Sequence, residues 1–283
     1  MEKFGYSGGY TKKHAAHLKQ GTDEILARIY EAVFEPLEMM IETNRIIIIP
    51  HGPLHYVPFH ALSDGLEYLL DQFEISRAPS ASVLKMCRAS ARRRSRQKTM
   101  LAVGVSAPDL PHVEDEIAGL CEVFADAVAL TGSEATQKNF LRLASCSRYL
   151  HIASHGRFRQ DNPMFSSLRL ADSHLNFYGL LDLRLRAEMV TLSACQTGVS
   201  AIIPGDELHG LMRGFLCAGA PSLVVSLWMV SDRSTALLMT EMYKRISAGE
   251  TKRAALRAAQ LEVRNLYPHP YYWAPFVLMG NPN

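Results

Sequence analysis

A histidine and a cysteine each follow a short apolar run in this chain of 283 residues. His155 comes after residues 149–153 and Cys195 comes after residues 190–193, and both runs are typical of buried strands. In a parallel sheet, the carboxyl ends of neighbouring strands form the edge where ligands and catalytic groups collect. A thiol is a good nucleophile as its thiolate, which a nearby imidazole can generate. The pair therefore predicts a hydrolase with a Cys–His dyad.

The residues around this pair could also supply the donors that acyl transfer needs. Gly156 follows the histidine, and small or turn-forming residues, Gln196-Thr197-Gly198, follow the cysteine. Such residues let the backbone turn and leave N–H groups free to bind a developing oxyanion. We predict an oxyanion hole made by the backbone N–H groups of Gly156 and Cys195. The alternative is a structural role, because cysteine at the end of a strand is commonly buried and inert.

The cysteines indicate a reducing compartment. There are five, an odd number, widely spaced and without a CxxC pair: Cys87, Cys121, Cys146, Cys195 and Cys217. This pattern favours free thiols in the cytoplasm over a disulfide framework or a zinc site. We expect the four cysteines other than Cys195 to be buried, inert fillers.

Composition excludes several classes of function. The chain is 48% hydrophobic and 20% charged, with a formal net charge of +2, as in an ordinary globular protein. That charge is too small to indicate nucleic-acid binding. No apolar run approaches the ~18–20 residues of a membrane helix, and the N-terminus lacks a signal-peptide pattern. We expect no membrane segment and no direct nucleic-acid partner.

Strands and helices alternate along most of the chain, which predicts an α/β fold with a mostly parallel sheet covered by helices on both faces. The polar first twenty residues are expected to be poorly ordered. Pro36 is expected to kink or split the helix around it. The expected strands are 46–49, 73–77, 100–105, 127–130, 149–153, 190–193, 222–227 and 276–279, and the expected helices are 23–43, 80–91, 113–124, 137–144, 206–218, 234–247 and 251–265.

A basic stretch separates the chain into two parts. Residues 88–98 hold six Arg or Lys side chains, which is typical of a solvated linker, with a docking or protease-sensitive loop as the alternative. Upstream, His51, His55 and His60 lie near prolines without companion cysteines or carboxylates at metal-ligand spacing. We read them as structural or surface histidines, and predict neither a metal nor a cofactor.

Seven stretches of the chain carry a family resemblance. They are 49–62 (IPHGPLHYVPFHAL), 78–82 (APSAS), 150–156 (LHIASHG), 192–198 (LSACQTG), 205–215 (GDELHGLMRGF), 218–228 (AGAPSLVVSLW) and 272–277 (YWAPFV). In this order they resemble the CHAT peptidases, caspase-like cysteine proteases that are related to caspases and separases and are often fused to TPR repeats.

The resemblance implies a fold, an activity and roles for individual residues. The implied fold is a caspase-like three-layer sandwich, with an N-terminal pseudo-catalytic half at residues 1–98 and a catalytic half at residues 99–283. The implied activity is that of a cysteine endopeptidase. His155 would be the general base, Cys195 the nucleophile and the Gly156 N–H a donor to the oxyanion.

Three acidic residues are candidates for choosing the substrate. Asp206, Glu207 and Asp232 could line a pocket beside Cys195 that favours Arg or Lys before the scissile bond. The alternative is a helix-capping role, because each stands where a helix should begin. Separases have an acid directly after the tryptophan that corresponds to Trp228, whereas this chain has Met229, which argues against a strict arginine preference.

Two other functions compete with a constitutive protease. One is a catalytically silent scaffold, or pseudoprotease, that binds peptides without cutting them. The other is a protease that stays inactive until a partner binds, since the family is often fused to TPR or sensor modules. The expected partners are a protein or peptide substrate and a TPR module, sensor or other regulatory protein.

Overall fold

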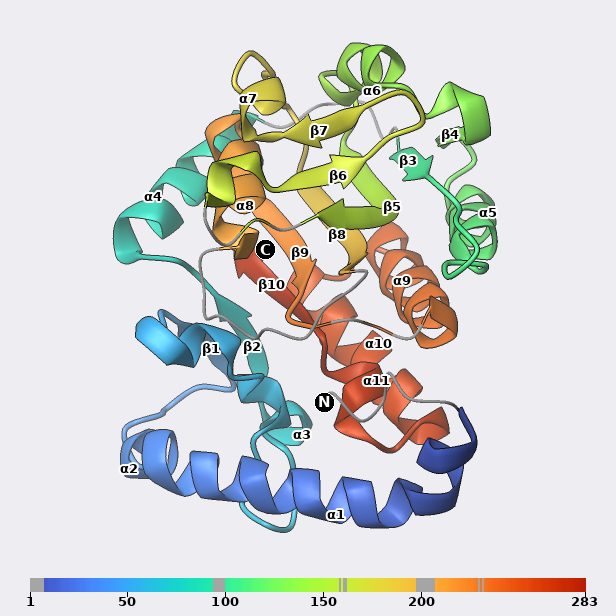
Figure 1. The fold of residues 1–283 in the computed structure, drawn as a ribbon. Helices are drawn as coiled ribbons and strands as arrows, with labels where there is room; N and C mark the ends of the chain where they lie inside the picture. The colour runs from blue at the N-terminus through green and yellow to red at the C-terminus, as the bar shows by residue number, and fades with distance from the viewer. Residues whose placement is uncertain are drawn as a thin grey trace.

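The chain forms a mixed sheet flanked by helices (Figure 1). The computed structural model describes residues 8–93, 100–157, 159, 162–196, 207–228, 230 and 232–283. The strands are β1 (Arg45–Ile48), β2 (Glu74–Arg77), β3 (Met100–Gly104), β4 (Val128–Thr131), β5 (Tyr149–Arg157), β6 (Ser167–Arg169), β7 (His174–Asn176), β8 (Met189–Gln196), β9 (Ser222–Ser226) and β10 (Phe276–Gly280). The helices are α1 (Gly8–Val33), α2 (Glu35–Glu38), α3 (Leu69–Gln72), α4 (Ala81–Ser90), α5 (Val113–Val123), α6 (Gln137–Ala144), α7 (Phe177–Leu180), α8 (Glu207–Cys217), α9 (Asp232–Ser247), α10 (Lys252–Leu266) and α11 (Pro270–Trp273).

The strand order brings distant parts of the chain together. It is β1-β2-β10-β9-β8-β5-β3-β4, with the β6–β7 hairpin added to the end of β5. Along this path each strand runs parallel to its neighbour except β10, which is antiparallel to β9. The predicted α/β class with a mostly parallel sheet is therefore confirmed. Strands from both sides of residue 98 belong to this one sheet, joined through β10.

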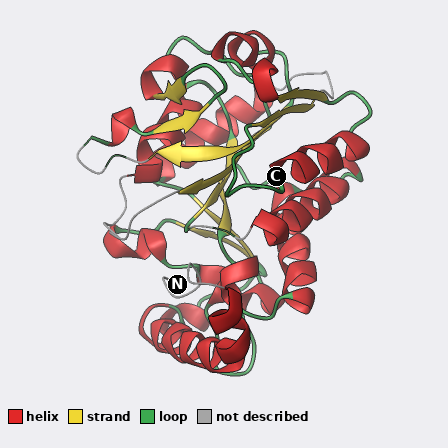
Figure 2. Ribbon diagram, turned by 45° about the vertical axis from the view of Figure 1, so that its right-hand side comes forward, coloured by secondary structure: helices red, strands yellow, loops and turns green. Residues whose placement is uncertain are grey.

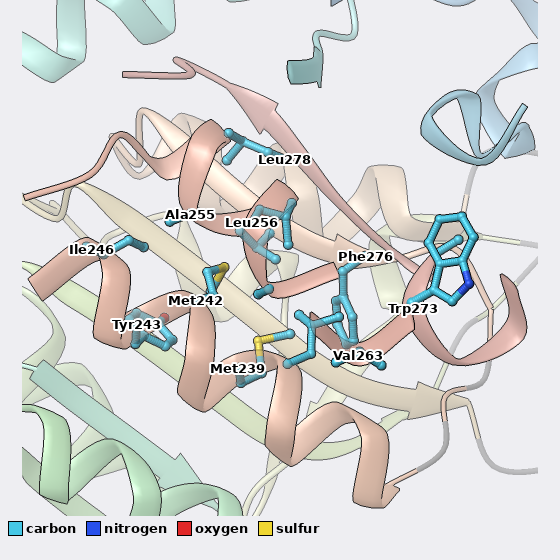
Figure 3. Close-up of a cluster of buried hydrophobic side chains, with 14 of the residues drawn as sticks. Met239, Met242, Tyr243, Ile246, Ala255, Leu256, Val263, Trp273, Phe276 and Leu278 are labelled. Atoms are coloured by element: carbon cyan, nitrogen blue, oxygen red, sulfur yellow. The ribbon is translucent and has the colours of Figure 1, made fainter. Parts of the chain in front are cut away.

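Alternating side chains of the central strands enter two apolar cores, as a strand period of two requires. In β5, Leu150 and Ile152 belong to the core beneath α4, α6 and α8. Tyr149 and Ala153 belong to the other, with α1, α5, α9 and α10. Figure 3 shows α9 and α10 packing side chains such as Met239 and Leu256 into that second core. The sheet is thus the middle of three layers, seen nearly edge-on in Figure 2.

Most predicted elements lie within a residue or two of their expected bounds, but β5 and β8 are longer. We expected β5 to end at residue 153 and β8 at residue 193, before the candidate catalytic residues. Instead β5 runs to Arg157 and β8 to Gln196, because the two strands keep pairing with each other and β6 pairs with the end of β5. The candidate residues therefore lie inside the ladder, not after it.

The expectation of poor order before residue 20 was wrong from Gly8 onward. Lys19 donates to Asp23 and to the Tyr68 hydroxyl, which in turn donates to Asp23, so this part of α1 is tied to the segment before α3. The split at Pro36 is confirmed, because α1 ends at Val33 and α2 starts at Glu35 with the proline in its first turn. Within the described residues, no helix is both long and apolar enough to cross a bilayer.

Two buried histidines should make the fold sensitive to acid. His60 accepts a hydrogen bond from Gln260, and burial lowers the pKa of His60 to about 3. His269 contacts Thr22 of α1, and burial lowers the pKa of His269 to about 4. Both histidines are neutral in the folded chain and protonate more readily when it unfolds. Stability is therefore complete above the unfolded pKa of about 6.5 and falls with pH below it.

For His60, the free energy of unfolding should fall by about 1.4 kcal/mol per pH unit as the pH drops from 6.5 to 3. His269 should lower it in the same direction down to about pH 4. Urea unfolding at a series of pH values measures this slope. His60→Gln should flatten it, whereas His174→Ala, which removes an exposed histidine, should not. An unchanged slope in His60→Gln would contradict the assignment.

Candidate active site

The two candidate catalytic residues are register partners in the centre of the sheet. The Cα atoms of His155 on β5 and Cys195 on β8 are paired, as are those of Gly156 and Gln196 in the next position. The partners on the outer sides stop earlier, since β3 ends opposite Ala153 and the β9 ladder ends opposite Leu192. The carboxyl ends of β5 and β8 thus project beyond their neighbours. Cα atoms on adjacent strands are about 4.8 Å apart, so the backbone brings the predicted pair together.

The imidazole of His155 is held on one side by Asp109. This aspartate lies in the loop after β3, which is the strand beside β5, and its Oδ1 is 3.0 Å from Nε2 of His155. The His155 side chain is 12% exposed, whereas that of Asp109 is 59% exposed. The interaction therefore joins an exposed carboxylate to a mostly buried ring.

This contact decides which ring nitrogen can act as a base. A carboxylate only accepts hydrogen bonds. When the His155 ring is neutral, its proton is therefore on Nε2, which donates a hydrogen bond to Asp109. The other nitrogen, Nδ1, is buried and has no hydrogen-bond partner among the residues that the structure describes. Nδ1 consequently holds the free lone pair. Sequence reasoning missed Asp109, since its role depends on β3 lying beside β5.

The backbone around Gly156 is extended. Gly156 pairs with Gln196 on one side and with Leu168 of β6 on the other. The sharp turn expected at this glycine is therefore absent, because the hairpin of β6 and β7 continues the ladder. The oxyanion role of the Gly156 and Cys195 N–H groups stays a prediction.

The three acidic candidates differ in what is described. Asp206 lies outside the described residues. Glu207 is the first residue of α8 and Asp232 the first of α9, and their side chains are also outside the description. Helix α8 follows β8, the strand that carries Cys195, and helix α9 follows β9, the strand beside it. Trp228, on the β9–α9 connection, donates from Nε1 to the carbonyl oxygen of Tyr271.

The other cysteines are only partly as expected. Cys87 is buried, and burial raises the pKa of its thiol to about 11; Cys121 is partly buried, with its pKa raised for the same reason. Cys146 and Cys217 are exposed, so the expectation that all four are buried was wrong. On α8, Phe215 and Leu216 belong to the buried apolar face, and Cys217, the next residue, lies on the solvent side.

A second histidine on β5 is structural. His151 is fully buried, and its Nε2 lies 2.8 Å from Oε1 of Glu116 on α5, although the two atoms are not aligned as a hydrogen bond. Its register partner Thr191 contacts the Tyr243 hydroxyl at 2.7 Å. These groups are closed to solvent, so they fix α5 and α9 against the strands that carry the site.

The described part of the chain contains no cluster of three or more His, Cys, Asp or Glu side chains arranged to hold a metal ion. Among the early histidines, His60 is buried, and its Nε2 lies 3.1 Å from the side-chain nitrogen of Gln260. His51 is exposed and His55 is half-buried. The structural reading applies to His60.

Comparison with known proteins relates the chain to a family. A family model described as "CHAT domain" matches residues 23–281. The chain is 25% identical to mouse tetratricopeptide repeat protein 28 and 24% identical to the human protein, over 90% of its own length in each case. It spans 13% of the length of each of these relatives.

Solved structures share the fold at low sequence identity. The Arg-specific cysteine proteinase gingipain R aligns with a TM-score of 0.59 and 13% identity over 92% of this chain and 66% of that one. Separase from the Saccharomyces cerevisiae separase–securin complex aligns with a TM-score of 0.55 and 16% identity over 80% of this chain and 14% of that one. The predicted caspase-like sandwich is therefore confirmed.

Proposed function

Because the chain belongs to the CHAT domain family, we propose that it is a cysteine endopeptidase that cuts protein substrates with Cys195 and His155. The observation that carries the proposal is the register of β5 and β8, which makes these two residues backbone partners where both strands project past their neighbours. Register partners share one face of a sheet. We therefore expect the Cys195 thiol, whose side chain lies outside the described part of the structure, on the same face as the His155 imidazole. The family and its fold supply independent support.

Acylation begins at the free nitrogen of His155. Nδ1 takes the thiol proton of Cys195, and the thiolate attacks the scissile carbonyl carbon to form a tetrahedral adduct. The backbone N–H groups of Gly156 and Cys195 would bind its oxyanion. The C–N bond then breaks as the imidazolium returns the proton to the leaving amine. The product is a thioester on Cys195.

Deacylation repeats these steps with water. Nδ1 accepts a proton from the water that attacks the thioester, and the thiolate of Cys195 leaves as the carboxylic acid forms. Asp109 contributes at both stages, because its carboxylate stabilises the imidazolium and holds Nε2 as a donor. Its exposure indicates a moderate contribution, as water competes for the same carboxylate.

The substrate class is proposed from the two helices that follow β8 and β9. Asp206, Glu207 and Asp232 would offer carboxylates to an Arg or Lys side chain before the scissile bond, and gingipain R, which shares the fold, is described as Arg-specific. Asp232→Asn should lower kcat/KM for such substrates about tenfold and leave neutral ones unchanged, if the carboxylate pairs with the cation. Matched fluorogenic peptides that differ at this one position measure the ratio. Equal losses for both peptides would leave Asp232 with the capping role.

The relatives suggest what kind of partner would release this activity. They carry tetratricopeptide repeats in their names, and the chain matches a small part of each. We propose that a repeat module or similar protein regulates the domain. A silent peptide-binding scaffold is the competing function.

A cleavage profile separates these functions. Wild-type protein and Cys195→Ala are incubated with a proteome-derived peptide library, alone and with added repeat protein. New termini that appear with wild type and not with Cys195→Ala support the peptidase. Peptides that are retained by both proteins and cut by neither support the scaffold.

Thiol labelling tests the dyad without a substrate. In a Cys146→Ser/Cys217→Ser background, which removes the two exposed thiols, limiting iodoacetamide at neutral pH should modify Cys195 well ahead of Cys87 and Cys121. Peptide mass spectrometry reports the order. Adding His155→Ala should slow labelling of Cys195 about tenfold or more, since the base is lost. Labelling that ignores His155 would contradict the pairing.

A further inference from the structure

The second-largest fully buried side chain of the described residues is an arginine without a countercharge. Arg77 is the last residue of β2 and is 2% exposed. Its guanidinium donates to the backbone carbonyl oxygens of His55 and Val57 and stacks over the ring of Phe59. Among the described residues, none of its partners is a carboxylate. A buried charge is costly when only neutral groups face it.

The nearest basic neighbours add to this imbalance. Arg253 and Arg257 of α10 line the same small cavity as Arg77. Arg253 pairs with Glu74, but that carboxylate also lies 3.6 Å from Arg45. Arg257 donates to two backbone carbonyl oxygens, those of Leu70 and Asp71.

Asp71, which directly follows Leu70 of the cavity lining, is already engaged by another arginine. The Asp71 carboxylate makes a bidentate pair with Arg264 at 2.6 and 2.8 Å. Burial lowers the pKa of Arg77 to about 9, which still leaves the group charged at neutral pH. Three arginines therefore line a cavity whose described lining includes no carboxylate.

The cavity has room for a small guest. Its volume is about 10 Å³, close to the least that holds one water molecule. Its polar lining also includes His60 and Gln260. His60 is neutral because its pKa is lowered to about 3, so it adds no charge at pH 7. A chloride ion is slightly larger than water, and we expect the half-buried Arg257 side chain to shift to admit it.

We propose that this cavity binds one small monovalent inorganic anion of chloride size, held by Arg77 with Arg253 and Arg257. The ion would neutralise the buried guanidinium and join three parts of the chain: β2, the 55–57 segment and α10. The site is unrelated to the chemistry of Cys195 and does not depend on the proposed peptidase.

Thermal unfolding in matched salts tests the proposal. Wild-type protein is titrated with sodium chloride against sodium gluconate at constant ionic strength, because gluconate is too large for the cavity. A chloride concentration ten times the Kd should raise Tm by about 2 °C, and above the Kd the rise should continue with the logarithm of the chloride concentration. Equal Tm values in both salts across the titration would overturn the proposal.

Three variants locate the site. Arg77→Met should abolish the chloride effect, and Arg257→Met should weaken it at least severalfold while leaving Arg77 in place. Arg142→Met, which removes an exposed arginine on α6, should keep the full effect. If Arg77→Met does not fold, Arg257→Met decides alone. A full effect in Arg257→Met would overturn the assignment.

Crystals grown in bromide give a direct readout. An anomalous peak within hydrogen-bond distance of the Arg77 guanidinium would support the site. A cavity that holds only water, without anomalous signal, would overturn it.

Discussion

Replacing either Cys195 or His155 with alanine should lower kcat/KM by about 10⁴-fold or more on any peptide that the wild type cuts. The nucleophile and the base act in one step, so the double variant should be no slower than the worse single variant. Initial rates with a fluorogenic peptide found by cleavage profiling measure the loss. Circular dichroism confirms that the variants fold.

Asp109 gives this prediction its finer test. Asp109→Ala removes the acceptor from Nε2 of His155 and should lower kcat roughly ten- to hundredfold with little change in KM, whereas Asp109→Asn keeps an acceptor oxygen and should lose less. Asp115→Ala is the matched control, because this exposed acid pairs with His112 instead. A fully active His155→Ala would refute the mechanism. A fully active Asp109→Ala would refute only the positioning role.

The sequence singled out the two residues that the structure makes register partners, but not the aspartate that contacts one of them. His155 and Cys195 could be found because each follows an apolar run, and runs of this kind indicate strands whatever surrounds them. Asp109 could not be found in the same way. It lies 46 residues from His155, in a loop without periodicity, and only the placement of β3 beside β5 brings the two together.

Strand lengths show the same limit. The ends of β5 and β8 are set by their mutual pairing through His155 and Cys195, a contact between strands that local propensity does not encode. Helix starts were easier, because caps are local. Ser80 and Thr136 accept hydrogen bonds from the N–H groups three residues on, which is the N-cap pattern that serine and threonine favour.

The place of β10 was also hidden from the sequence. It was expected as one more strand, but it enters between β2 and β9 and runs antiparallel to β9. The early strands β1 and β2 reach the rest of the sheet through this one element. Its last residue, Gly280, has a φ of +91°, and Asn281 directly after it donates to the carbonyl oxygen of Pro221.

Gly280→Ala should therefore destabilise the fold by about 4 kcal/mol, or roughly 8 °C in Tm. The alanine would have to adopt a left-handed backbone conformation, and its Cβ would collide with the Pro221 carbonyl oxygen. That oxygen cannot withdraw easily, because it accepts the 2.8 Å hydrogen bond from the Asn281 N–H.

Gly249→Ala separates the two costs. Gly249 has a similar φ of +98° after α9, but nothing lies within 4 Å of its Cβ position, so only the conformational cost of about 1 kcal/mol applies. Urea unfolding of both variants measures the difference. An excess loss of several kcal/mol in Gly280→Ala assigns that cost to the close packing of β10 against the start of β9. Equal losses in the two variants would mean that the backbone at Pro221 yields, and that β10 holds β2 to the sheet less rigidly than its geometry indicates.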